Sequence, residues 1–237
     1  RQQRKREIGS FRFAWEFMNS PLNDETAPIK DSQIRTWTEL PKQYNAVIAV
    51  DPAYSEDDTA DYKVASLILC DQFANRYLAH YIRMHGKIGE FQDAIINLWL
   101  SHRAEVTAIG LPNSGVEKAF FDSFVRKCQD RKLYPPVVEL KNSFVQSGTT
   151  ISVRNKTARV IAALQPLFEQ GKYFIGSEMI EARDELMSIG FSKHDDLVDT
   201  MAYGEQLLQN GYMPPDDIKL NSRGEIDELV TSECYGY

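Results

Sequence analysis

The chain has few cysteines and no long apolar run. Its 237 residues include three cysteines, Cys70, Cys128 and Cys234, which lie far apart and form no CxxC pair. An odd, scattered set of this kind argues against a disulfide framework and against a zinc site, and it favours a reducing compartment. No apolar stretch approaches the roughly 20 residues that a membrane-spanning helix needs. We therefore expect a soluble intracellular protein with no membrane span.

Two familiar motifs are also absent. No GxxxxGK[ST] stretch occurs, so the sequence carries no P-loop ATPase site. The first ten residues, RQQRKREIGS, lead into no apolar segment, which argues against a signal peptide and secretion. The net charge of −7 argues mildly against a nucleic-acid partner, but an acidic pocket can stand beside a local basic rim.

Apolar patterning predicts one α/β domain. The run NAVIAV before Asp51 is typical of a strand buried on both faces, and 62–71 and 75–83 read as a strand hairpin. Helices and strands then alternate. We expect helices at 87–103, 115–131, 155–171, 177–190 and 195–211, and strands at 105–111, 135–140 and 172–176. This order predicts a mixed central β-sheet flanked by helices on both faces.

The chain divides into three parts by composition. Residues 1–43 read as an irregular lead-in, 44–212 as the folded domain, and 213–237 as a loose tail rich in turn-forming residues. We expect aromatic residues inside the predicted helices to pack in the core, namely Phe120, Phe121, Phe124 and Phe168.

Asp51 closes the first core strand. Ligands of open α/β sheets bind outside the carboxyl ends of strands, so a carboxylate there is well placed for a metal ion. The simpler interpretation is a turn made with Pro52. Asp61 lies just before the next predicted strand, and hairpin pairing would bring it beside Asp51.

A second acidic group stands in FSKHDDLVDT, where Asp195, Asp196 and Asp199 crowd like charges together. Asp195 and Asp196 fall at the predicted helix cap and first turn, where the helix dipole favours a negative charge. The dipole does not explain Asp199, which shares a helix face with Asp195 and repels it. The two groups together indicate two divalent cations with oxygen ligands, as in phosphodiester hydrolysis.

Several segments of the sequence resemble a known family. The segments YNAVIAVDPAYSEDDTADYKVASLILCD, NKTARVIAALQPLFEQGKYFI and GFSKHDDLVDTMAYG resemble, in matching order, the nuclease domain of the large terminase subunits of tailed bacteriophages. The lead-in FRFAWEFMNSPLNDETAPIKDSQI resembles the segment that joins the terminase ATPase domain to this nuclease. The resemblance implies an RNase H-like fold and a Mg²⁺- or Mn²⁺-dependent endonuclease that cuts concatemeric viral DNA during genome packaging.

The resemblance also implies roles for individual residues. Asp51, Asp195 and Asp196 match the catalytic acidic positions, and Asp61 matches a further one that is often acidic. With Asp199 these form the expected metal-binding set. Lys156 and Arg159 match a basic pair at a helix start, which by charge would meet a phosphate or else form a solvated helix face. We expect DNA to follow Lys141, Arg154, Lys156 and Arg159.

One position departs from the family pattern. An acidic residue is expected at the end of the fourth strand, where this chain has GLPNSG, with Pro112 or Asn113 in its place. Glu117, on the following helix, is a candidate replacement. This departure supports one alternative, a catalytically silent DNA-binding or portal-interaction module. Another alternative is an RNase H-like nuclease that acts on RNA–DNA hybrids or recombination junctions, but the lead-in before Asp51 argues for a terminase instead. His194 is a candidate for orienting a carboxylate, or is simply exposed.

The resemblance further implies partners and a location. Double-stranded DNA, an ATPase domain in the full-length protein, a small terminase subunit and a portal are the expected partners. The expected location is the host cytoplasm, with transient docking at the procapsid portal.

Overall fold

A computed structural model gives the structure of the chain. It describes residues 27–53, 62–113, 115, 117–140, 144–146, 149–151, 156–191 and 195–208. The main sheet contains β1 (Arg35–Trp37), β2 (Tyr44–Asp51), β3 (Lys63–Asp71), β4 (Arg76–Met84), β5 (Val106–Pro112), β6 (Val137–Leu140) and β9 (Tyr173–Gly176). The helices are α3 (Ile88–Ser101), α4 (Glu117–Asp130), α5 (Lys156–Glu169), α6 (Ile180–Met187) and α7 (Asp196–Leu207).

The seven-stranded sheet is mixed, in the order β1-β9-β4-β3-β2-β5-β6. The strands β2, β3 and β4 pair in antiparallel fashion, as the hairpin pattern predicted. The strands β5 and β6 extend the sheet in parallel from β2, and β9 joins the other side in parallel with β4. The expected mixed sheet flanked by helices is therefore confirmed.

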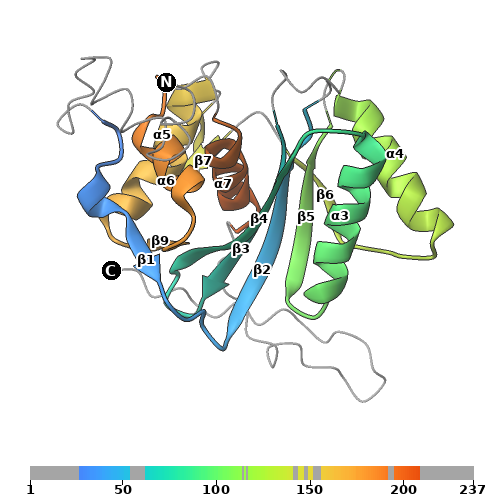
Figure 1. The fold of residues 1–237 in the computed structure, drawn as a ribbon, viewed down its shortest axis with the longest axis horizontal. Helices are drawn as coiled ribbons and strands as arrows, with labels where there is room; N and C mark the ends of the chain where they lie inside the picture. Colours follow the sequence, from blue (N-terminus) through green and yellow to red (C-terminus); the bar gives the residue numbers. More distant parts are fainter. Residues whose placement is uncertain are drawn as a thin grey trace.

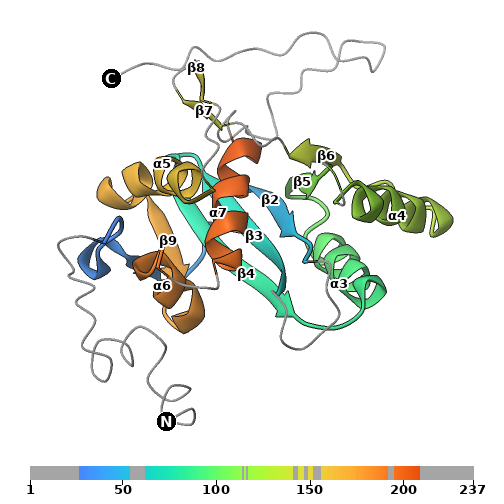
Figure 2. The ribbon, with the colours of Figure 1, turned by 90° about the horizontal axis from the view of Figure 1, so that it is seen from above.

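Helices cover both faces of the sheet (Figures 1 and 2). The helices α3 and α4 lie on one face, whereas α5, α6 and α7 lie on the other. Side chains of β2 and β3 alternate between two cores, since successive strand residues point to opposite faces. Ile48 and Leu67 belong to the α3/α4 core, while Val47 and Ile68 belong to the α7 core.

The core confirms the predicted aromatic packing. Phe120 and Phe124 are buried on the α3/α4 side, where Phe121 packs against the same cluster, and Phe168 is buried on the other side. On the α7 side, a Cβ atom added at Gly204 would collide with the side chain of Ile68. The glycine therefore lets α7 lie directly on β3.

The lead-in differs from the expectation of an irregular segment. Arg35–Trp37 forms the edge strand β1, which pairs with β9 about 140 residues later, and Asp31–Gln33 forms the short 3-10 helix η1. Ile29 and Ile34 are buried in the core. Three residues are too short to show a period-two pattern, and this strand depends on its distant partner.

A second difference lies between β6 and α5, where no element was expected. The segments β7 (Phe144–Gln146) and β8 (Thr149–Ile151) pair as a separate antiparallel hairpin. In the described part of the chain, no helix is long and apolar enough to cross a membrane.

Candidate active site

Asp51 ends β2, the strand between β3 and β5 in the middle of the sheet. In the pairing of β2 with β5, Ala49 lies opposite Gly110. Because both strands run in the same direction, the end of β2 lies next to the end of β5, where Pro112 stands. The side chain of Asp51 is partly buried at this edge.

The second acidic group lies at the start of α7, which packs on β2 and β3 (Figure 2). Asp195 is the N-cap residue and Asp196 the first helical residue, as expected. Asp196 is only 6% exposed and Asp199 is fully buried. The first turn of α7 therefore brings two buried carboxyl groups toward the central strands.

The two acidic groups interact electrostatically. Burial raises the pKa of Asp51 to about 7, and the charge of Asp199 is the next cause of the rise. Asp196 raises this pKa further, whereas Lys156 opposes the rise. Asp51, Asp196 and Asp199 thus form an acidic cluster in which the carboxyl groups repel one another, and an added cation would relieve the repulsion.

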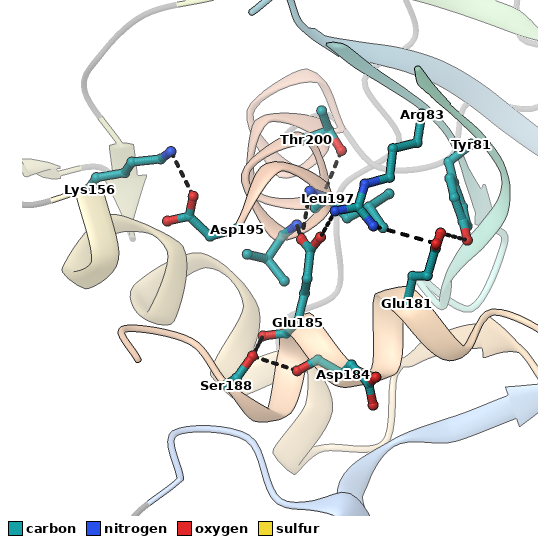
Figure 3. Close-up of polar contacts among 11 residues, drawn as sticks. Tyr81, Arg83, Lys156, Glu181, Asp184, Glu185, Ser188, Asp195, Leu197 and Thr200 are labelled. Carbon is teal, nitrogen blue, oxygen red and sulfur yellow. Dashed lines mark hydrogen bonds and ion pairs between the residues drawn. The ribbon is translucent and has the colours of Figure 1, made fainter. Parts of the chain in front are cut away.

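Lys156 supplies positive charge at this acidic cluster. It begins α5, and its Nζ donates to Asp195 Oδ1 at 3.0 Å (Figure 3). The same ammonium group forms an ion pair with Asp199. Burial by itself would lower the pKa of Lys156, but the charges of Asp199 and Asp195 outweigh it and raise that pKa. The like charges at positions 195 and 199 are therefore bridged by one ammonium group.

Arg159, one turn further along α5, also faces inward. It is 8% exposed, its Nη2 lies 3.4 Å from Asp199 Oδ1, and its guanidinium lies 4.8 Å from the centre of the Tyr203 ring. Burial raises the pKa of Asp199 to about 6 against the opposing charges of Lys156 and Arg159. In this structure Lys156 and Arg159 thus compensate the negative charge of Asp199. The contact of this basic pair with DNA stays a prediction.

Glu117 begins α4, five residues after the end of β5. Its charge is among the causes that raise the pKa of Asp51, and it also raises the pKa of Tyr203. Glu117 therefore adds negative potential at Asp51, and in sequence it follows Pro112 and Asn113, which stand where an acid was expected.

Several predicted site residues lie outside the described residues, namely Asp61, Lys141, Arg154 and His194. Their assignments stay predictions.

The structure adds an ion pair that no local sequence pattern indicated, between the buried Glu185 of α6 and the half-buried Arg83 of β4. Glu185 Oε2 accepts a hydrogen bond from the backbone N–H group of Leu197 at 2.8 Å (Figure 3). It also accepts one from the backbone N–H group of Val198 at 3.4 Å. Asp195, the N-cap residue, makes no side-chain cap hydrogen bond. A carboxylate from another helix thus caps α7, and spacing within α7 could not reveal it.

The donor set suits a hard divalent cation in chemistry, because all candidate ligands are carboxylate oxygens. Among the residues that the structure describes, however, no three His, Cys, Asp or Glu side chains gather closely enough to hold a metal ion as they stand. Lys156, by contrast, lies against both Asp195 and Asp199. A bound cation would therefore compete with this ammonium group.

No protein-family model matches the sequence, and no curated protein matches it either. Solved structures do match the fold. The nuclease domain of the P22 large terminase superposes with a TM-score of 0.53 at 14% identity, over 78% of this chain and 92% of that one. The manganese-soaked, inhibitor-bound terminase nuclease domain of human cytomegalovirus gives 0.51 at 11% identity, over 76% and 95%.

A longer protein matches in part. The large terminase of a thermophilic bacteriophage superposes with a TM-score of 0.54 at 9% identity, over 77% of this chain but 43% of that one. This chain therefore spans less than half the length of that longer terminase. These solved structures share one architecture with this chain, which has the RNase H-like fold of the nuclease domains of large terminases.

Proposed function

We propose that this chain is a divalent-metal-dependent endonuclease that cleaves concatemeric double-stranded viral DNA during genome packaging. The observation that carries the proposal is the meeting of Asp51 from β2 with Asp196 and Asp199 from α7, in a fold shared with terminase nuclease domains. The mutual repulsion of these carboxyl groups supports a site built for cations.

Asp51 and Asp196 would hold Mg²⁺ or Mn²⁺, with Asp195, Asp199 and Asp61 completing the ligands. Two such ions, when bound, stabilise the charges of the attacking and leaving oxygens in phosphodiester hydrolysis. Glu117 would strengthen cation binding through its negative charge near Asp51. Arg159 would hold Asp199 in place through the buried contact between them.

DNA would be held beside this acidic cluster by basic side chains. Lys156 is half exposed beside Asp195, so its ammonium group can turn toward a phosphate once a cation takes its place. Lys141, Arg154 and Arg159 would extend this contact. An ATPase domain, a small terminase subunit and a portal are the proposed partners in the full-length protein, and the host cytoplasm and procapsid portal the proposed location.

Cleavage of supercoiled plasmid tests this proposal. The chain is incubated with Mn²⁺, Mg²⁺ or EDTA beside the isosteric variants Asp51→Asn and Asp196→Asn. Both variants are expected to lose more than about 100-fold in cleavage rate, because even groups that only support metal ligands typically contribute 10–100-fold. Asp122→Asn, which removes an exposed carboxylate of α4, is the matched control and should cut normally.

A second candidate is a silent DNA-binding or portal-interaction module of the packaging motor. Pro112 and Asn113 in place of an acid, and the lack of a ready cluster of three ligands among the described residues, favour it. A folded wild-type chain that binds DNA but cuts it with neither metal would contradict the endonuclease and support the module.

A further inference from the structure

Glu185 of α6 caps the N-terminus of α7, the helix that carries Asp196 and Asp199. The first N–H groups of a helix have no partner within the helix, and a side chain of the N-cap residue usually satisfies them. Here Glu185 Oε2 accepts from Leu197 and Val198, the second and third helical residues. These two residues stand between Asp196 and Asp199, so the bonds fix the backbone that carries both acids.

Arg83 holds the other oxygen of Glu185. Its Nη2 lies 3.3 Å from Glu185 Oε1, and its guanidinium lies 4.0 Å from the centre of the Tyr62 ring. The exposed Glu181 is a second, longer partner at 3.6 Å and accepts a hydrogen bond from Tyr81. Figure 3 shows the chain of contacts from β4 through Glu185 to the start of α7. The N-terminus of α7 is thus anchored to the sheet through two charged side chains.

A neutral side chain could cap the helix with a smaller desolvation cost than a buried acid. Glu185 is 6% exposed, and burying an ion pair costs desolvation energy that its attraction often only balances. Burial raises the pKa of Glu185 to about 8 against the charge of Arg83, and Asp196 raises it further. The chain therefore keeps a buried acidic side chain against the backbone of Leu197 and Val198, beside the acidic turn of the candidate site.

We propose that Glu185 and Arg83 are a positioning pair, which holds the first turn of α7 so that Asp196 faces Asp51 and thereby sets the affinity for divalent cations. Glu185 acts through the backbone of Leu197 and Val198 and does not itself contact the cation. This inference rests on the proposed metal-dependent function and identifies residues that govern it from outside the acidic cluster of Asp51, Asp196 and Asp199.

The test compares two buried acidic side chains, Glu185 of α6, which contacts the N-terminus of α7, and Glu205, which belongs to α7 itself. Glu205, near the C-terminal end of α7, pairs with Arg76 of β4 at 3.1 Å and is 9% exposed. Glu185→Gln and Glu205→Gln each replace one buried acidic side chain that pairs with an arginine of β4. Both are expected to lower the melting temperature, but only Glu185→Gln changes the end of α7 that carries the acids.

Mn²⁺ binding is measured by titration calorimetry, with melting temperature and plasmid cleavage alongside. Glu185→Gln is expected to weaken Mn²⁺ binding about tenfold, the usual size for groups that orient metal ligands, whereas Glu205→Gln leaves it unchanged. Cleavage by Glu185→Gln should recover when Mn²⁺ is raised about tenfold. Arg83→Lys, which keeps the charge but loses the fork of the guanidinium, should have a smaller effect in the same direction, and it replaces Glu185→Gln if that variant does not fold.

The outcomes separate the two proposals. Equal Mn²⁺ affinity in wild type and Glu185→Gln, or equal weakening in Glu185→Gln and Glu205→Gln, overturns the positioning pair and leaves the endonuclease standing. A folded wild type that binds no Mn²⁺ and cuts no DNA overturns the endonuclease, and the positioning pair with it.

Discussion

On the α3/α4 face of the sheet, the buried contacts are mainly apolar, whereas the α7 face carries buried ion pairs along the length of the helix. Phe91, Phe120 and Phe124 pack together on the first face, and its ion pairs, such as Lys127 with Asp93, lie near the surface. On the second face, Glu185, Asp199 and Glu205 are all buried with arginine partners.

The contacts of the α3/α4 face therefore mainly stabilise the fold, whereas the ion pairs of the α7 face mainly fix the position of the helix. Apolar burial stabilises a fold without requiring one exact arrangement, whereas buried charges stabilise little and tolerate only the geometry that pairs them. The α7 helix is also tied to β3 by a 2.6 Å hydrogen bond between Ser66 and Thr200. Polar contacts therefore specify the position of α7, the helix that carries the acids of the candidate site.

The largest expected loss of stability comes from the apolar face. Phe124 is fully buried, and Phe124→Ala should cost about 3–5 kcal/mol of unfolding free energy, because it removes a large side chain and leaves a cavity. Urea denaturation followed by circular dichroism measures this. The Mn²⁺ affinity of the folded variant should stay at the wild-type value, and a selective loss of metal binding would break the proposed division between the faces.

A moderate effect is expected from pH on the α7 face of the metal-free protein. The folded-state pKa values of Asp51, Asp199 and Glu185 are raised to about 7, 6 and 8. The folded state therefore binds more protons than the unfolded state between about pH 4 and 8, and its stability should fall as pH rises through this window.

Melting temperatures in EDTA at successive pH values check this dependence. Asp51→Asn should flatten the curve up to about pH 7 and raise the melting temperature at pH 8, since it removes one repelling carboxylate. Mn²⁺ should restore the stability of wild type at pH 8, because metal ligands bind in their deprotonated form. A melting temperature that rises with pH in EDTA would contradict this account.

The smallest effects should come from single lysines, one on each face. Lys156→Ala removes a half-exposed ammonium group that competes with a cation, so Mn²⁺ affinity should rise about fivefold, corresponding to about 1 kcal/mol. Lys127→Ala removes the surface partner of Asp93 and should change unfolding free energy by less than about 1 kcal/mol, with no change in Mn²⁺ affinity. Weaker Mn²⁺ binding by Lys156→Ala would show that Lys156 supports the site rather than competing for it.

Much of the fold could be predicted because its signals are local. Continuous apolar runs marked β2 and β5, and the apolar spacing of α3 and α4 marked helices. Strand β1 could not be predicted, because three residues carry no periodicity and their pairing with β9 is distant. The same limit applied to the site, where Asp51 and the acids of α7 stood out as clusters but the partners of those acids did not.

By itself, the sequence determined the alternation of strands and helices, the acid that closes a central strand and the acidic first turn of α7. These features depend on neighbours within one helical turn or one strand. Only the tertiary structure decided that Lys156, 39 residues before Asp195, bridges it to Asp199, and that Glu185 rather than Asp195 caps α7. Ion pairs and caps of this kind form where packing brings separate elements together, and no local spacing records which elements will meet.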